Sequence, residues 1–378
     1  MQWIGTKHVA FVPVDRGTFN DFPPPANWQA DIEARIYSKQ YATGNISLRD
    51  YIYTVSYGRA DLQGTVKPVV NLARKDVPPD FLASQLEAQL RSEKFDAAAL
   101  VMLGNPPVGQ AAGIFQYWVR FSIAERVGVW AMELTHLLTG YWDLYTNDTA
   151  NDLNAYDNMD CACGTHPTAY TKLQLGWLDD SAIAVDTAKS ARFDLHSIAL
   201  VQPPPAGRFA AVRIETGGNP LYVEARLMLD RYDGGRASDS WDSSGIGVSG
   251  VIVYELAGVE NPNPEPGLVD PLIRLRTKPV VALGQTFTSS DGIEVKVTDA
   301  IPGGFTVSIT NPVGLVAVPD VYGMPAALAR NEIHKSGLVA ASHPPNGLWV
   351  KSQSPVGGML VKSGSTVTLT LATSGSPP

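Results

Sequence analysis

The 378-residue sequence predicts an α+β protein, and three observations lead to this fold class. Residues 1–182 alternate between strand and helix patterns, residues 183–312 contain short β-rich runs, and residues 313–378 combine a helix pattern with a final strand. Gly, Pro, Asp and Asn separate the runs of the middle part, which is typical of an antiparallel β domain. We therefore expect three domains with these boundaries.

The first domain is expected to contain strands and helices in alternation. Apolar runs predict the strands, and apolar side chains at helical spacing predict the helices, the first of which is capped by Ser47. The strands are expected at residues 9–14, 64–72 and 97–103, and the helices at residues 48–56, 79–93 and 121–138. The last helix pattern is the longest and is very apolar, so we expect it to lie at the centre of the domain.

The middle domain is expected to be built from strands and the last domain from one helix and a sheet. Short β-rich runs predict strands at residues 209–214, 221–229, 250–256, 294–298 and 305–309. Residues 325–336 predict a helix and residues 366–371 predict the final strand. Residues 230–247 carry several aspartates and are expected to form a surface loop.

Composition and charge exclude several classes of protein. Lys and Arg number 29 against 37 Asp and Glu, and a net charge of −8 without a basic block argues against nucleic acid as the main partner. The longest uncharged run, residues 97–119, contains a proline pair, so we expect no membrane-spanning helix. No signal peptide pattern is found, which leaves a cytoplasmic location and export by another route open.

The apolar helix pattern contains the run Met132-Glu133-Leu134-Thr135-His136. In a zinc peptidase helix of the form His-Glu-x-x-His, two imidazoles four residues apart bind the metal and the glutamate acts as general base. Glu133 and His136 are in register with this motif, but Met132 occupies the position of the first histidine. Taken alone, Glu-x-x-His also fits a partly buried polar pair that binds no metal.

The segments around this run resemble the M6 metallopeptidases, the immune inhibitor A-like family. The similar segments, in order along the chain, are residues 47–64, 137–145, 156–160, 166–177, 221–226 and 250–254. The resemblance spans most of residues 8–310 and implies a zincin- or metzincin-like peptidase core in residues 1–182. It also implies that residues 183–312 are the β-rich domain that follows the catalytic domain in this usually secreted family.

The resemblance assigns a role to each residue that matches the family motif. Glu133 matches the general base, His136 a zinc ligand, Asp143 the third ligand, and Met159 the methionine of the turn beneath the metal. Met132 is the departure, because catalytic zinc normally takes three protein ligands and a neutral thioether suits copper(I) better than zinc. We therefore expect a degenerate site that has lost its zinc, in which Glu133 pairs with His136.

Two further metal sites are considered near the motif. Cys161 and Cys163 follow Met159 closely, so the thiolate of Cys163, or His166, could replace the missing ligand. The alternative is a pair of small packed residues or an exposed thiol pair, since two cysteines are too few for a disulfide framework.

Side chains that carry oxygen also crowd residues 143–160, and this composition fits calcium. The residues considered as ligands are Asp148, Asp152 and Asp157. The alternative is a solvated loop in which the short polar side chains form local turns.

The ordered motifs of residues 316–372 resemble a PASTA domain. They include Val318-Pro319-Asp320, Ser336-Gly337-Leu338 and the run from Val361 to Leu369. The resemblance implies one helix packed on a three-stranded sheet. In bacterial cell-wall proteins such domains are associated with peptidoglycan, but a single copy can also dock a protein or serve as a spacer.

Three functions remain from the sequence. We expect an M6-like metallopeptidase homologue that is catalytically impaired by Met132 and binds a protein or peptide in its cleft, or acts in assembly. The alternatives are an active zinc metalloendopeptidase with an altered ligand set, and a structural protein of a particle or cell wall. Trp118, Trp130, Trp142 and Trp177 could mark a partner surface, although a buried core is the more usual place for tryptophan.

Overall fold

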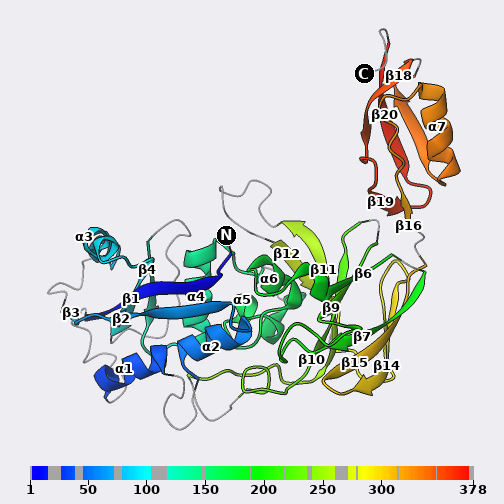
Figure 1. Cartoon of the computed structure of the whole chain (residues 1–378). Coiled ribbons are helices and arrows are strands. Elements are labelled where there is room, and N and C mark those ends of the chain that lie inside the picture. Colours follow the sequence, from blue (N-terminus) through cyan, green and yellow to red (C-terminus); the bar gives the residue numbers. More distant parts are fainter. Residues whose placement is uncertain are drawn as a thin grey trace.

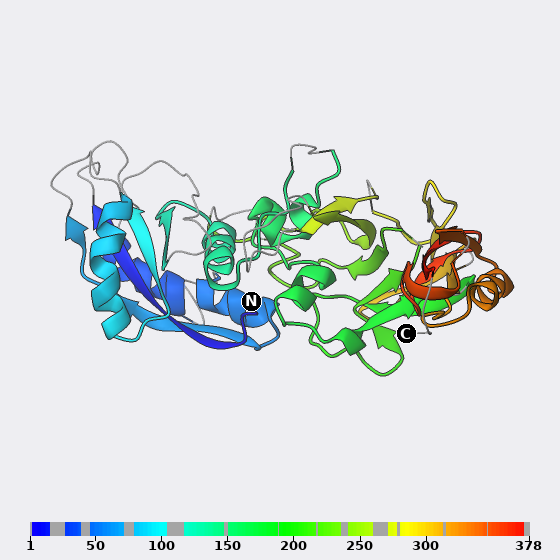
Figure 2. The ribbon, with the colours of Figure 1, turned by 90° about the horizontal axis from the view of Figure 1, so that it is seen from above.

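The computed structural model describes most of the chain. The described residues are 2–15, 27–38, 46–71, 79–103, 117–146, 150–187, 189–216, 218–235, 241–259, 271–277, 280–312, 315–345 and 347–373. Figures 1 and 2 show an α/β part at one end and a β part beside it, and Figure 1 shows a small C-terminal unit that projects from the β part. The α+β fold class is confirmed at this level, with sheets as the main component.

The first part is built on a parallel sheet. Its order is β2-β1-β4-β5, and β3 also pairs with β1. The strands are β1 (Gly5–Asp15), β2 (Ala60–Val66), β3 (Val70–Asn71), β4 (Ala97–Leu103) and β5 (Trp118–Ser122). Every residue of β4 is buried, because a parallel strand covered on both faces needs a continuous apolar run.

Helices cover both faces of this sheet. They are α1 (Trp28–Tyr37), α2 (Leu48–Val55), α3 (Pro79–Ser92) and α4 (Val127–Thr139). Alternate residues of β1 point to opposite faces, so Val9 and Phe11 pack with α1, α2 and α4, whereas Ala10 and Val12 pack with α3. The central position expected for the apolar helix is confirmed by α4.

The structure divides two of the expected elements. The helix expected at residues 121–138 is instead strand β5 followed by α4, because a short apolar run fits a strand as well as a helix. The strand expected at residues 64–72 is divided between β2 and β3. Gly140 follows the last residue of α4, and its left-handed φ of 73° is typical of a glycine that ends a helix.

The β part contains two five-stranded sheets that enclose a shared core. One has the order β12-β11-β10-β9-β6 and the other β13-β14-β15-β7-β8. The strands are β6 (Ile183–Asp186), β7 (Ser190–His196), β8 (Arg208–Phe209), β9 (Ala211–Ile214), β10 (Leu221–Arg226), β11 (Gly250–Val259), β12 (Pro271–Leu275), β13 (Thr286–Thr288), β14 (Glu294–Ile301) and β15 (Gly304–Thr310). Pairing is antiparallel except for β6 with β9 and β7 with β8.

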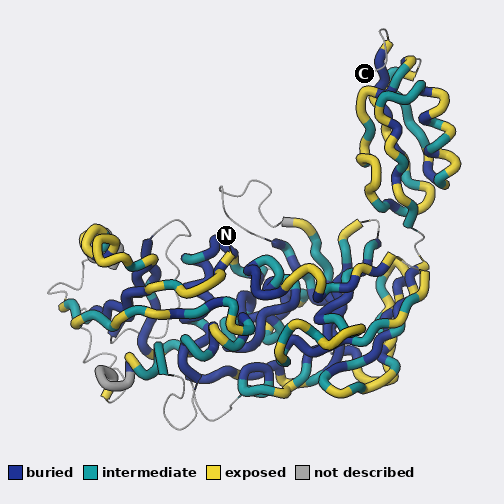
Figure 3. Tube along the Cα trace, viewed as in Figure 1, coloured by how far each residue is buried: buried dark blue, intermediate teal, exposed yellow. Residues whose placement is uncertain are grey.

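The α/β part and the β part also share one hydrophobic core. Tyr222, Ile252 and Tyr254 of the β part belong to the same buried cluster as Trp130 and Leu134 of α4. Figure 3 shows buried stretches of the trace in the interior of both parts. The two parts therefore pack as one unit, although their sequences differ in character.

A buried ion network reinforces this contact. The guanidinium of Arg226, at the end of β10, donates to Asp233 from Nε at 3.0 Å and from Nη2 at 2.9 Å. It also donates to the carbonyl oxygens of His166 and Tyr156 in the segment that follows α4, and Glu224 lies 3.3 Å away. The expectation of a surface loop at residues 230–247 is wrong for Asp233, which is fully buried and pairs with Arg226.

The C-terminal unit has the architecture that the PASTA resemblance implies. Helix α7 (Ala326–Lys335) packs on a sheet of order β17-β20-β18, and β16 (Leu315–Ala317) pairs with β19 (Leu360–Lys362). The three strands of the sheet are β17 (Val339–His343), β18 (Trp349–Ser354) and β20 (Thr366–Ala372). In the described part of the chain, no helix is long and apolar enough to span a membrane.

We predict that Arg226→Met lowers the free energy of unfolding by about 3–5 kcal/mol, because it leaves the Asp233 carboxylate buried without its cation. The measurement is urea denaturation followed by circular dichroism. The matched control is Arg192→Ala, which breaks an exposed pair with Asp299 in the same β part and should cost less than about 1 kcal/mol. Equal losses in the two variants would contradict the role given to Arg226.

Candidate functional site

Helix α4 carries three of the residues singled out by the sequence motif. Met132, Glu133 and His136 are all buried, with exposed fractions of 5%, 7% and 3%. Gly128, in the first turn, lets the helix approach the segment after Met159, because a Cβ atom there would lie 2.1 Å from the Ala162 carbonyl oxygen. The sequence places glycine where the helix and this segment touch.

His136 is held between two acceptors. Its Nδ1 lies 2.5 Å from the Tyr141 carbonyl oxygen and its Nε2 lies 2.9 Å from Asp143 Oδ1. Burial alone would lower the pKa of His136, but the hydrogen bond and charge of Asp143, together with Glu133 and the Tyr141 carbonyl, raise it. With an acceptor at each nitrogen, the favoured form is an imidazolium that donates to both.

Glu133 does not pair with His136 as expected, because Asp143 occupies that position. The Oε2 atom of Glu133 is buried and has no hydrogen-bond partner among the described residues. Burial is the main cause that raises the pKa of Glu133 to about 7. His136 lowers this pKa, and the charges of Asp143 and Glu125 raise it further. The carboxyl group therefore changes protonation near neutral pH.

The residues present do not fit a conventional catalytic zinc. A catalytic zinc needs three protein ligands. His136 and Asp143 provide only two ligand side chains, which bond each other, and Met132 supplies only a thioether. No group of three or more His, Cys, Asp or Glu side chains with metal-binding geometry occurs among the described residues. An imidazolium must also lose a proton before it can bind a metal.

Neither of the proposed replacement ligands is available in this arrangement. Cys161 and Cys163 form a disulfide, so Cys163 is not a thiolate. Both nitrogens of His166 are engaged elsewhere, Nε2 with Asp230 at 2.7 Å and Nδ1 with Lys172 at 2.8 Å. The expectation that Cys163 or His166 completes the ligand set is therefore corrected.

Met159 lies in the short helix α5 (Asn158–Cys161), beneath the segment that carries Asp143. Its carbonyl oxygen accepts from the backbone N–H of Leu144 at 2.9 Å, and its side chain is buried in the same cluster as Met132. Asp157 caps α5 by accepting from Met159 N and also accepts from Thr168 N, just before helix α6 (Ala169–Gln174). A backbone hydrogen bond thus joins Met159 to Leu144, the residue after Asp143.

Two aromatic side chains beside Asp143 are exposed. The exposed fractions of Trp142 and Tyr145 are 40% and 52%, and the ring of Trp142 lies 6.2 Å from the His136 ring. Burial and the neighbouring Asp143, which bonds the hydroxyl, raise the pKa of Tyr145. A partner surface and a buried core were both considered for Trp142, and the adjacent Asp143 was the available signal of exposure.

The proposed calcium ligands have separate roles. Asp148 lies outside the described residues. Asp152 accepts from the backbone and hydroxyl of Thr146, and Asp157 is occupied by the backbone donors of Met159 and Thr168. The local-turn alternative accounts for Asp152 and Asp157.

We predict that Glu133→Gln stabilises the protein in a pH-dependent way. Because folding raises the pKa of Glu133 from 4.5 to about 7, the stability that the wild-type carboxyl retains below pH 4.5 is lost as pH rises through 7. The variant should match the wild type near pH 4.5 and exceed it by at most about 3 kcal/mol at pH 8. Urea denaturation at intervals between pH 4.5 and 8 checks this, and a constant difference would contradict it.

Comparisons with known proteins identify the C-terminal unit. No curated protein matches the chain. The resemblance of residues 8–310 to M6 peptidases has no support from these comparisons and rests on the motifs and their order. A protein-family model described as the PASTA domain matches residues 316–373, so the chain carries a PASTA domain at its C-terminal end.

Proposed function

We propose that this chain is an M6-like metallopeptidase homologue that has lost its catalytic zinc and binds a protein or peptide at the former active site. The observation that carries the proposal is the ion pair between His136 and Asp143, the two retained ligand positions. Because Met132 occupies the third ligand position, the charge of Asp143 is balanced by His136 and not by a metal ion. The scaffold is retained and the catalytic chemistry is lost.

The surroundings of the pair support a binding role. Trp142 and Tyr145 expose aromatic surface on either side of Asp143, and aromatic residues are enriched where proteins bind one another. The Tyr145 hydroxyl donates to Asp143 and can still accept a hydrogen bond, which suits a peptide N–H group. The expected partner is therefore a protein segment that packs on these two rings.

An active metallopeptidase with an altered ligand set is the second candidate. The observation that favours it is Glu133, whose buried carboxylate oxygen has no partner among the described residues and whose pKa is about 7. A general base operates best when its pKa is near the working pH. Under this alternative, a metal would have to convert His136 to its neutral form.

The PASTA domain supplies a second contact. Its family match suggests binding to peptidoglycan or peptides, and we propose that it docks the chain on one of them. Docking on peptidoglycan would associate the chain with the cell wall. The alternative is that the domain is only a spacer, and the co-sedimentation experiment below distinguishes the two roles.

We predict that Met132→His restores a zinc site, because histidines at positions 132 and 136 lie one turn apart on the same face of α4, beside Asp143. The variant should bind one zinc at least about 100-fold more tightly than the wild type, measured by competition with a chromogenic chelator. A casein assay should show activity in the variant but not in the wild type.

Two controls make this test specific. Met132→Leu adds no ligand and should bind no more zinc than the wild type. Met132→His combined with Glu133→Gln should bind zinc without hydrolysing casein, since the general base is removed. Failure of Met132→His to bind zinc would contradict the peptidase ancestry, whereas casein hydrolysis by the wild type would select the second candidate.

We predict that the full chain co-sediments with purified insoluble peptidoglycan and that a chain ending at residue 312 does not. The truncated chain keeps the cores of the α/β and β parts, because the buried cluster of the PASTA domain is separate from theirs. Circular dichroism provides the folding control. If the full chain stays in the supernatant, the PASTA domain does not dock on peptidoglycan.

A further inference from the structure

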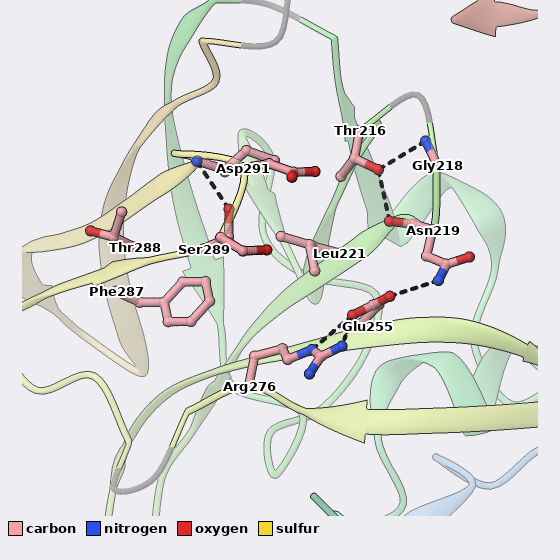
Figure 4. Close-up of a pocket in the computed structure, with 12 residues that line it drawn as sticks. Thr216, Gly218, Asn219, Leu221, Glu255, Arg276, Phe287, Thr288, Ser289 and Asp291 are labelled. Carbon is pink, nitrogen blue, oxygen red and sulfur yellow. Dashed lines mark hydrogen bonds and ion pairs between the residues drawn. The ribbon is translucent and has the colours of Figure 1, made fainter. Parts of the chain in front are cut away.

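A pocket opens in the β part, away from the residues of the peptidase-like motif. It lies between the two sheets, with walls from β10, β11, β13 and the loops that adjoin them. Its volume is about 410 Å³, which is within the range of small-molecule sites. Figure 4 shows Glu255, Asn219 and Arg276 on one side of this hollow and Phe287 on the other, near Ser289.

The polar side of the pocket is held in a fixed arrangement. Glu255 accepts from Asn219 Nδ2 at 2.7 Å and from Arg276 Nε at 2.7 Å. A guanidinium has five N–H donors, so Arg276 retains donors beyond those directed at Glu255. The side chains are therefore ordered before any ligand arrives, which lowers the entropy cost of binding.

The opposite side offers apolar surface next to hydroxyl groups. The Phe287 ring is partly buried against the core of the β part and borders the pocket. Ser289 and Ser290 follow it in the turn after β13, and both also line the pocket. A ligand here meets an aromatic face and short hydroxyl side chains together.

The charged groups of the pocket are already paired, so none of them offers an unbalanced cation to an anion. The positive charge of Arg276 is balanced by Glu255, and the rim holds a second acidic residue, Asp291. Asp291 is itself paired with Lys362 of the PASTA domain at 3.0 Å. A neutral ligand that both donates and accepts hydrogen bonds suits these groups best.

We propose that this pocket binds a neutral saccharide. Sugar hydroxyls donate and accept at once, so they can bond the Glu255, Asn219 and Arg276 group, while the C–H face of a pyranose ring packs on Phe287. The ion pair between Asp291 and Lys362 places the PASTA domain at the rim of the pocket. A glycan chain held here therefore begins next to that domain.

The test is a ligand-observed NMR titration of the full chain with N-acetylated chitotriose, a neutral trisaccharide called chitotriose below, and with the anionic tri-galacturonate. We expect chitotriose to bind and tri-galacturonate to bind at least about tenfold more weakly. Ser290→Trp places a large side chain in the pocket from an exposed turn and should weaken chitotriose binding by about tenfold or more. Arg192→Ala, in the same part of the chain but outside the pocket lining, should bind like the wild type.

Three results would overturn the proposal. They are the absence of chitotriose binding at millimolar concentration, tri-galacturonate binding as tight as that of chitotriose, and unchanged chitotriose binding in Ser290→Trp. Unchanged binding in Ser290→Trp would mean that chitotriose binds at another surface, such as the PASTA domain. Phe287→Leu, which keeps apolar volume but removes the ring, serves as a second variant and should also weaken binding if Ser290→Trp does not fold.

Discussion

One buried guanidinium, that of Arg226, connects the β part to the segment that supports the motif helix. It bonds Asp233 and the carbonyl oxygens of Tyr156 and His166, so a charge that would be costly alone is fully compensated. The segment between those two carbonyls contains Met159, whose backbone holds the residue next to Asp143. The position of Asp143 beside His136 therefore depends on contacts that do not involve a metal, and the site keeps its shape with Met132 in place.

Much of the fold could be predicted from local sequence patterns. Strand β4 and helix α2 follow from a continuous apolar run and from the cap at Ser47, since both signals lie within a few residues of the element. Strands β6, β7, β12 and β13 were not predicted, because they are short or owe their place to partners distant in sequence. The boundary between β5 and α4 was also missed, as an apolar run does not separate a buried strand from a buried helix.

The residues of the candidate site could be predicted from the sequence, but the hydrogen bonds between them could not. The motif and its order identified Glu133, His136, Asp143 and Met159, and the structure brings His136 and Asp143 into contact. The partner of His136 could not be inferred, because helical spacing favours Glu133 whereas the turn after Gly140 brings Asp143 back to the ring. The disulfide and the Arg226 network were missed as well, since contacts such as Arg226 with His166 join residues that local spacing cannot relate.

The zinc content of the wild-type chain tests the central claim most directly. The chain would be expressed with added zinc, purified without chelators, and analysed by inductively coupled plasma mass spectrometry. The account predicts zinc far below one ion per chain, because His136 and Asp143 satisfy each other and Met132 supplies no suitable ligand. One zinc per chain, lost on replacing His136 by alanine, would contradict it and establish a metal centre at this ion pair.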